Sequence, residues 1–485
     1  MDSLKHKTVR GLWWSFLETI GLQGTRFIIG IVLARLLFPE QFGLIGMLMI
    51  FTAVAQSFLD SGFGAALIQK RHATPMDICS IFYFNIAVGI LAAGVLCALA
   101  PGIAAFYNQP ILTPLTRALS LTIVINSFGL VQTTILEKQI NFKALTKVSL
   151  ISSGLSGIIG IAMATAGFGV WSLVAQQISA SFFRVVVVWL VNDWRPEPVF
   201  SVTSLREMFG FGSRMMASGL LNQIFSNIYF LVIGKLFSAT DLGFFTRATS
   251  LEQLPSRTLS GMVGRVTFPV LSSIQDDPAR LKRGLKKALT TLVLVNFPVM
   301  IGLAVIARPL VLVLLTDKWI GCVPYLQLLS LAGATYSLHL INLNLLQALG
   351  RSDLFLRLEI VKKLLTVVNI AVTWRWGISA MIYGMIVLSI LTYYLNSYYT
   401  GILIGYPIRE QLRDLSPYLA MSAVMAGSVH GIGFLPFPNN LCLLVAQIIS
   451  GGLIYALLCR LFRLAAFMEI WHVGRNKLSL LGAKI

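Results

Sequence analysis

The sequence has little charge and lacks long polar stretches. Only 12% of its 485 residues are Asp, Glu, Lys or Arg, whereas 56% are hydrophobic. A water-soluble domain is about one quarter charged, so this composition excludes an ordinary soluble protein. The connections between the apolar stretches are short, which leaves no room for a soluble catalytic domain. We therefore expect a protein that is dissolved in lipid.

Motifs for metal, redox or nucleophilic chemistry are also scarce. The five cysteines form no CxxC pair, so neither a disulfide framework nor a thiolate metal site is indicated, and the five histidines are scattered. We expect no metal, no cofactor, no catalytic residue and no enzymatic activity. The first apolar stretch carries Glu18 and Arg26 instead of a short, purely apolar core, so we also expect no cleaved signal peptide.

The apolar residues form about fourteen runs of roughly 17 to 30 residues, each long enough to cross a bilayer as a helix. The sequence thus predicts an all-α polytopic membrane protein with about 14 transmembrane helices. The expected spans are 11–36, 41–60, 79–103, 113–137, 146–167, 169–191, 206–234, 239–271, 285–316, 321–350, 355–377, 379–403, 415–431 and 441–463.

The basic residues are distributed unevenly between the two sides of the membrane. The chain has 38 Lys and Arg against 19 Asp and Glu, a net charge of +19, and most of the basic residues fall on the connections that share a side with the N-terminus. Because cytoplasmic loops are rich in Lys and Arg, we expect both termini to be cytoplasmic. This explains the basic excess without a nucleic acid partner. We expect the run from Arg280 to Lys287 to face anionic lipid headgroups.

The chain contains a weak internal repeat. A shift of 200 residues places Arg35–Phe38 on Lys235–Ser238 and Gln41–Leu44 on Asp241–Phe244. Transporters are often built from such repeated halves. We expect two six-span lobes, at 1–195 and 200–405, followed by an additional pair of spans at 415–463 and a basic cytoplasmic tail at 464–485.

Polar residues inside the apolar runs are the main evidence for a site. A charged side chain at the bilayer centre costs about 2.5–3.5 kcal/mol, so it usually faces a cavity or a partner. One face of the first span and one face of the seventh are polar, and these spans correspond in the repeat. We expect them to border a cavity, although Ser and Asn can also simply join helices. The two faces consist of Ser15, Glu18, Thr19, Gln23, Thr25 and Arg26, and of Arg214, Ser218, Asn222, Gln223, Ser226 and Asn227.

Arginine outnumbers acid within these runs. Guanidinium stays charged and binds phosphate oxygens through paired donors, so the cargo is expected to be anionic. Arg117, Arg247 and Arg265 lie near span ends and are expected to reach the headgroups. The deeper arginines, with neighbouring polar residues, form the candidate substrate site: Arg26, Arg214, Arg257, Gln23, Asn222 and Ser218.

Two acidic residues need separate interpretations. Glu18 is either the counterion of Arg26 or a protonatable site for ion coupling, since burial would raise its pKa. Asp60 is expected to make a contact at a helix end and to take no part in transport.

Five segments of the sequence are distinctive: Ala34–Leu44, Asp60–Gln69, Leu136–Leu145, Gly167–Val174 and Phe268–Asp277. In this order they resemble the Wzx-type polysaccharide exporters of the multidrug/oligosaccharidyl-lipid/polysaccharide superfamily. The similarity is to the colanic-acid and teichuronic-acid exporter branch and extends to about residue 405.

The resemblance implies a V-shaped pair of lobes that opens alternately to each side of the bacterial plasma membrane. It implies a flippase that moves an undecaprenyl-diphosphate-linked oligosaccharide to the outer leaflet for the assembly of surface polysaccharide, such as O-antigen or exopolysaccharide. It also implies a cationic cavity, coupling to an H⁺ or Na⁺ gradient, and contact with membrane lipids and with polymerase and chain-length proteins.

Two other functions remain open from the residues. A drug or cation antiporter of the same superfamily would need acidic residues at the heart of the first lobe, where Glu18 alone is well placed. A membrane glycan polymerase or ligase usually needs a sizeable segment outside the membrane with positioned acid or base groups.

Overall fold

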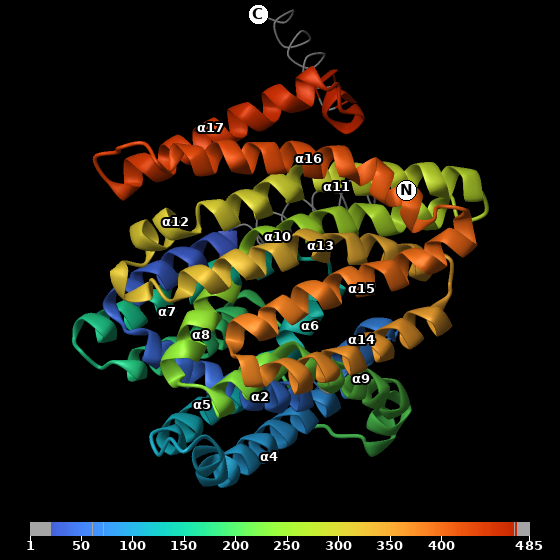
Figure 1. The fold of residues 1–485 in the computed structure, drawn as a ribbon. Helices are drawn as coiled ribbons and strands as arrows, with labels where there is room; N and C mark the ends of the chain where they lie inside the picture. The colour runs from blue at the N-terminus through green and yellow to red at the C-terminus, as the bar shows by residue number, and fades with distance from the viewer. Residues whose placement is uncertain (1–20, 61, 71, 470, 473–485) are drawn as a thin grey trace, which may run out of the picture. The chain divides into compact units, whose positions relative to one another are not determined.

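The computed structural model describes residues 21–60, 62–70, 72–469 and 471–472 (Figure 1). Within them all regular structure is helical, and residues 21–36 form the first described helix. The longer helices of the first half are α2 (Pro39–Asp60), α4 (Pro75–Tyr107), α5 (Leu112–Ser127), α7 (Phe142–Thr165), α8 (Val170–Val191), α9 (Val202–Leu236) and α10 (Ala239–Ser273). Those of the second half are α11 (Pro278–Val305), α13 (Cys322–Ala348), α14 (Ser352–Thr373), α15 (Ile378–Ile404), α16 (Ile408–Ile432) and α17 (Asn440–Leu461).

Shorter helices complete two of the expected spans and one connection. α5 continues into α6 (Leu130–Lys138) after a bend of 44°, and the two together cover the span expected at 113–137. α11 is followed by α12 (Ala307–Leu314), and α3 (Phe63–Gln69) follows α2. Every span expected from residue 41 onward therefore coincides with a helix or with such a pair.

The chain is an all-α polytopic membrane protein. Among the described residues, eight helices are long and apolar enough to cross a membrane by length and composition, or nine if α5 and α6 count as one bent span. The expected number of about 14 is higher because it includes charged helices such as α10 and α14. These helices carry five charged residues or more each, among them Arg247 and Glu252 in α10 and Lys362 and Lys363 in α14.

Side-chain caps determine where several helices begin. Thr74 and Asp77 form a reciprocal capping box at the start of α4, with Thr74 N donating to Asp77 Oδ2 at 2.9 Å and Asp77 N donating to Thr74 Oγ1 at 3.2 Å. The Asp277 side chain accepts from Arg280 N, 3.0 Å away, at the start of α11. These caps satisfy backbone donors that have no partner within the helix.

The described residues divide into two compact units, with the boundary between Thr246 and Arg247, inside α10. In the first unit α7 packs on α8, α4 on α5, and α2 on α9. The expected lobe boundary at 195–200 lies earlier, before α9. α9 belongs to the first unit because it packs against α2, α3 and α4. The six-span lobes stay a prediction.

Helix ends follow the 200-residue repeat closely. The first described helix ends at residue 36 and α9 ends at Leu236, while α2 begins at Pro39 and α10 begins at Ala239. The repeat noticed in the sequence is therefore also present in the boundaries of the helices.

The second unit is built around α11, which packs against α13 and α16. α16 and α17 run side by side, as the uppermost red helices of Figure 1 show. One large apolar cluster takes residues from α11, α13, α15, α16 and α17, with Leu281, Leu285 and Leu289 completely buried. The last helix pair is thus part of the core of this unit.

A buried polar network also ties α16 to the unit. The amide of Gln411, fully buried, accepts a hydrogen bond from Tyr393 OH at 2.8 Å and donates one to the Tyr406 carbonyl at 3.0 Å. Asn342 Nδ2 lies 3.5 Å from the same Gln411 oxygen, and Asn342 Oδ1 accepts from Thr400 Oγ1 at 2.9 Å. Each bond satisfies a polar group that lipid could not solvate.

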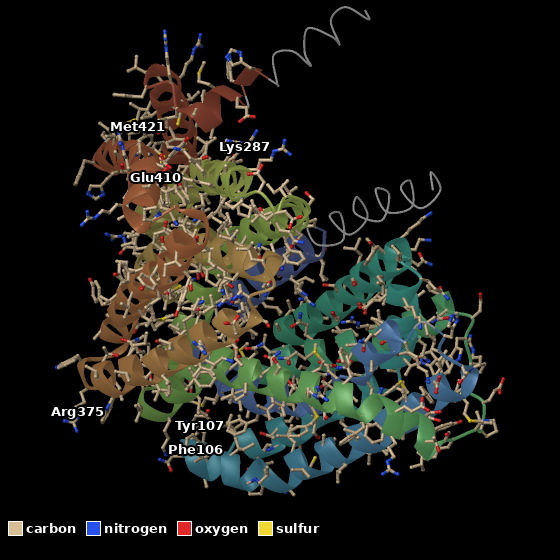
Figure 2. The ribbon with its side chains drawn as sticks, turned by 90° about the vertical axis from the view of Figure 1, so that its right-hand side faces the viewer. Phe106, Tyr107, Lys287, Arg375, Glu410 and Met421 are labelled. Carbon is tan, nitrogen blue, oxygen red and sulfur yellow. The ribbon has the colours of Figure 1, made fainter. Side chains whose placement is uncertain are left out.

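Three lysines of the basic run at the start of α11 contact carboxylates, where headgroup contacts were expected. Lys282 Nζ lies 2.6 Å from Glu410, Lys286 Nζ lies 2.7 Å from Asp414, and Lys287 pairs with Glu469. Figure 2 labels Lys287 and Glu410 on this side of the second unit. α16 and the C-terminal segment bring these acids beside the three lysines, and contact of the basic run with headgroups stays a prediction.

We predict that Gln411→Leu destabilises the protein more than Gln347→Leu, a matched change at an exposed position of α13. The first change leaves Tyr393 and the Tyr406 carbonyl without a buried partner, which costs about 1–3 kcal/mol for each unsatisfied group. Thermal unfolding in detergent would measure the difference. Equal melting temperatures for the two variants would contradict a structural role for the network.

Candidate functional site

Three adjoining cavities lie in the first unit. Their volumes are about 400, 370 and 200 Å³, and we call them the first, second and third cavity. The first cavity shares Asp60 and Leu130 with the second, and it shares Asn126 and Arg184 with the third. The cavities therefore adjoin one another, separated by shared side chains.

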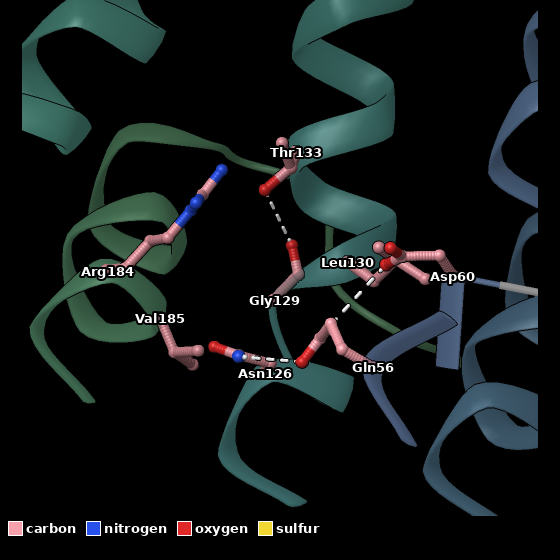
Figure 3. Close-up of a pocket in the computed structure, with 8 residues that line it drawn as sticks. All are labelled: Gln56, Asp60, Asn126, Gly129, Leu130, Thr133, Arg184 and Val185. Atoms are coloured by element: carbon pink, nitrogen blue, oxygen red, sulfur yellow. Dashed lines mark hydrogen bonds between the residues drawn. The ribbon is translucent and has the colours of Figure 1, made fainter. Parts of the chain in front are cut away.

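The first cavity holds a carboxylate and a guanidinium opposite each other (Figure 3). Asp60 comes from the last turn of α2 and Arg184 from α8. Asn126 Nδ2 donates to Gln56 Oε1 at 3.2 Å, and Gln56 Nε2 lies 3.4 Å from Asp60 Oδ1. This chain of amides orients Asp60.

The bend between α5 and α6 gives the first cavity its wall. Gly129 lies at the bend, and a Cβ there would lie 3.0 Å from a methyl group of Val185. The residue thus lets α8 approach closely enough to bring Arg184 to the cavity. Thr133 Oγ1 donates to the Gly129 carbonyl at 2.9 Å, which satisfies a backbone group near the break.

The third cavity joins two arginines with a wall of hydroxyl groups. Arg26 and Arg184 both line it, together with serines of α7 and with Gln176 of α8. Two guanidinium groups beside one small cavity repel each other unless an anion lies between them. The arrangement suits an anion held by the two guanidinium groups beside a polar wall. The serines that line it are Ser149, Ser152, Ser153, Ser156 and Ser181.

The second cavity has a different charge. Asp60 and Glu137 line it together with Gln223 of α9, and its lining contains no Lys or Arg. Asp60 therefore lies between a cavity that Arg184 also lines and one whose lining has no Lys or Arg.

The structure brings only part of the expected substrate site together. Arg26 lines the third cavity, whereas Arg214, Ser218 and Asn222 are exposed on α9 and line none of the three cavities. Gln23 is half-buried, one turn before Arg26. Their roles in binding stay predictions. Glu18 and the side chain of Arg257 lie outside the described residues.

Two residues outside the predicted substrate site, Asp60 and Arg184, line these cavities. Asp60 does end α2, as expected, but it also lines two cavities. Arg184 lines the same cavity as Arg26, although it was not among the residues predicted for the substrate site. A signal for this site was present: Ser149, Ser152, Ser153 and Ser156 follow the i, i+3, i+4, i+7 spacing of one helix face.

Arg247 packs inward, although it was expected to reach the headgroups. Its guanidinium lies 6.0 Å from the centre of the Trp319 ring, and Trp319 is completely buried. A cation over an aromatic face is stabilised by the ring's quadrupole, which favours this inward orientation.

Among the described residues, no three His, Cys, Asp or Glu side chains are arranged to hold a metal ion. Within that part of the chain, the polar groups that converge are the guanidinium, amide, hydroxyl and carboxylate groups of the three cavities.

Comparison with known proteins identifies the family. A family model described as a polysaccharide biosynthesis protein matches residues 32–324, more than half of the chain. The chain belongs to this polysaccharide biosynthesis family. The resemblance noticed in the sequence is thereby confirmed.

Curated relatives of this family member cover most of its length. The teichuronic acid biosynthesis protein TuaB of Bacillus subtilis is 28% identical over 357 residues, which are 73% of this chain and 74% of that protein. The lipopolysaccharide biosynthesis protein WzxC of Escherichia coli is 26% identical over 441 residues, or 89% of each chain. The succinoglycan biosynthesis transport protein ExoT of Rhizobium meliloti is 29% identical over 327 residues, which are 67% of this chain and 66% of that protein.

Solved structures share the fold of this family member. The lipid II flippase MurJ, in an inward closed conformation, superposes with a TM-score of 0.77 at 14% identity, covering 93% of this chain and 98% of that one. An inward-facing multidrug transporter of the MATE family, from the multidrug/oligosaccharidyl-lipid/polysaccharide superfamily, gives a TM-score of 0.63 at 15% identity. The match covers 81% of this chain and 98% of that one. The fold is thus that of the multidrug/oligosaccharidyl-lipid/polysaccharide transporters.

Proposed function

We propose that the protein flips an undecaprenyl-diphosphate-linked oligosaccharide from the cytoplasmic to the outer leaflet of the bacterial plasma membrane for surface polysaccharide assembly. The observation that carries this proposal is the third cavity, where Arg26 and Arg184 face a wall of serines inside a multi-pass membrane protein. Relatives named for teichuronic acid and lipopolysaccharide biosynthesis support a glycan cargo. The fold shared with a lipid II flippase supports transport of a lipid-linked molecule.

The physical task is to carry a diphosphate and a polar glycan across about 30 Å of hydrocarbon. The two guanidinium groups replace the water of the diphosphate through charge-assisted hydrogen bonds. Serine and amide groups contact sugar hydroxyls, while the polyprenyl tail stays in lipid. Alternating access follows when bound cargo shifts the populations of the two states. No covalent step is required, which is why we propose a transporter and no enzyme.

In this proposal both termini are cytoplasmic, because most Lys and Arg residues lie on that side. α2 then begins at the outer end, at Pro39, and ends toward the cytoplasm, at Asp60. The three cavities consequently lie toward the side from which the cargo enters. The polymerase, the chain-length proteins and the binding of membrane lipids belong to the same proposal.

Asp60 has a specific role in this mechanism. It faces Arg184 across the first cavity, so its carboxylate competes with the cargo's phosphate for the same guanidinium. Such competition weakens binding and allows release. Coupling to an H⁺ or Na⁺ gradient would use Asp60 or Glu18, the carboxylates nearest the two arginines in space or along the chain.

A cation or drug antiporter is the second candidate. The second cavity favours it, because Asp60 and Glu137 line this cavity and its lining contains no Lys or Arg. Mass spectrometry of lipid extracts from depleted cells separates the two candidates. A flippase predicts that a lipid-linked oligosaccharide accumulates as its polymer disappears. If both pools are unchanged and no second exporter is present, efflux of cationic drugs becomes the assay to make.

We predict that Arg26→Ala and Arg184→Ala each reduce export about 10-fold or more, because each removes charge-assisted hydrogen bonds worth about 1.5–3 kcal/mol. Arg→Lys should restore export only in part, since the paired donors are lost. The readout is the lipid-linked pool in cells with equal amounts of protein in the membrane. Arg117→Ala, at an exposed position on α5, is the control. Normal export by both alanine variants would remove these residues from the mechanism.

We predict that Asp60→Asn slows turnover and increases retention of cargo, because the competing negative charge is lost while the size is kept. Asp60→Glu should stay closer to the natural protein. Cargo that co-purifies with the protein, measured by mass spectrometry, reports retention. Asp353→Asn on exposed α14 is the control. Equal retention by the Asp60→Asn variant and the natural protein would contradict competition.

A further inference from the structure

The second unit contains a buried histidine that the proposed mechanism does not use. His339, on α13, is only 9% exposed, and its imidazole contacts hydroxyl groups of α15. Its Nε2 lies 3.0 Å from Ser389 Oγ and 3.4 Å from Thr392 Oγ1. α13 and α15 pack along each other within this unit, as Figure 1 shows. An ionisable group inside a helix bundle of a membrane protein points to a function.

The hydroxyl groups determine which imidazole nitrogen carries the hydrogen. Each hydroxyl has one hydrogen to donate. Thr392 donates its hydrogen to the Ser389 carbonyl, 3.0 Å away, so its oxygen accepts from His339 Nε2. Thr335 donates to the Ala332 carbonyl at 3.0 Å, and Ser389 therefore donates to Thr335 and accepts from Nε2. Both counts place the hydrogen of the neutral imidazole on Nε2.

The other ring nitrogen, Nδ1, is therefore a bare acceptor. It is buried, and among the described residues no group forms a hydrogen bond with it. A buried polar atom without a partner costs free energy, because it has given up its bonds to water. The neutral imidazole is thus incompletely satisfied in this structure, and a proton is the smallest ligand that Nδ1 can bind.

A second buried group without a partner lies nearby on α15. Asn396 is completely buried, and within the described part of the chain neither its amide oxygen nor its amide nitrogen has a hydrogen-bond partner. Thr392, one turn before Asn396, contacts His339. Thr400, one turn after it, donates to Asn342, the next polar residue of α13 after His339. A proton would turn Nδ1 into a donor, and the amide oxygen is an acceptor at this level of the helix pair.

One positive charge already lies beside the imidazole. Lys362 of α14 is close enough to oppose a positive charge on His339. Its Nζ pairs with Glu359 of the same helix at 3.1 Å. α14 packs on both α13 and α15. Because the opposition depends on the distance between the two cations, a movement of α14 changes it.

The other helices around α13 bring different groups. Tyr393 of α15 has its ring centre 6.2 Å from that of His339. α10 places Glu252 against Gly333, about 9 Å before His339 along α13. α11 contacts the backbone of α13 through the amide of Asn296. The charged residues of α11 lie in its first three turns and that of α12 is exposed, and they are Arg280, Lys282, Arg283, Lys286, Lys287 and Arg308.

We propose that Nδ1 of His339 is a proton-binding site, and that it binds its proton when the Lys362 charge moves away. This site deepens the proposed function, on which it rests, because it names H⁺ as the coupling ion. It adds a site in the second unit to the carboxylates Asp60 and Glu18. The structure has the arrangement of the neutral imidazole, with the ammonium group near. When the transport cycle moves α14, one positive charge replaces the other, and the proton gradient thereby acts on that movement.

Nuclear magnetic resonance of ring-labelled histidine observes each nitrogen directly, in the full-length protein in lipid nanodiscs without cargo. The His339→Gln variant identifies the signal, and its amide N–H can still donate to Ser389. We expect a protonated Nε2 and a bare Nδ1 at alkaline pH. A hydrogen on Nδ1 of the neutral ring would overturn the site, because the atom assigned to the incoming proton would already be occupied.

Lys362→Gln tests the exchange of charge. It should raise the protonated fraction of His339 at mildly acidic pH several-fold over that of the natural protein, because the opposing charge is lost. Lys363→Gln removes the same charge at the next position of α14 and is the matched control. Equal protonated fractions in the two variants would contradict the exchange. Melting temperatures in detergent show whether each variant is folded.

Export in cells tests whether this proton drives transport. An uncoupler that collapses the proton gradient should increase the lipid-linked oligosaccharide pool several-fold in the natural protein and in His430→Gln, a control at an exposed position of α16. In His339→Gln the pool should be high already and no longer respond. An equal response of the two variants would refute coupling through His339. If the spectra are as expected but the pool does not respond even to depletion of the protein, the proposed cargo is wrong and the proton site stands.

Discussion

Hydrocarbon cannot solvate a charge or an unpaired hydrogen-bonding group, and the structure depends on this constraint. Backbone groups form their hydrogen bonds within the helices. The two units therefore differ in where their polar side chains find partners. In the first unit many of them line three adjoining cavities, with Arg26, Arg184 and Asp60 among them. A cavity of this kind keeps polar groups accessible to a polar cargo.

In the second unit, a group of buried polar side chains forms hydrogen bonds within the core. Gln411, Asn342 and Tyr393 bond to one another or to the backbone and leave little for a ligand. The lysines that open α11 pair with acids of α16 and of the C-terminal segment. Satisfied networks make a core rigid, whereas cavity groups with weaker bonds can exchange partners. Among the described residues, the three cavities lie in the first unit, whereas the network around Gln411 is part of the packing of the second.

Close approach of helices is the other recurring device. Small residues let membrane helices come near enough for backbone contact, which compensates for the weak hydrophobic drive between helices in lipid. Gly43 and Gly243 allow a close approach where α2 contacts α10, and Gly129 allows one where α8 contacts the bend between α5 and α6. In both places the missing side chain allows a close approach, of α2 to α10 in one case and of α8 to the bend in the other.

The amino-acid sequence by itself determined the helices, their approximate bounds and the family, because a run of apolar residues and its flanking caps are local properties. It also indicated Arg26 and the 200-residue repeat. The partner of Arg26 was decided by tertiary structure: Arg184 and the α7 serines lie more than 120 residues from Arg26 along the chain, and only the packing of α7 on α8 brings them to one cavity. Helical periodicity shows which residues share a face but not which faces meet, since many pairings bury similar apolar area. For the same reason the acids beside Lys282 and Lys286, and the contact between Gly43 and Ala239, could be read only from the folded chain.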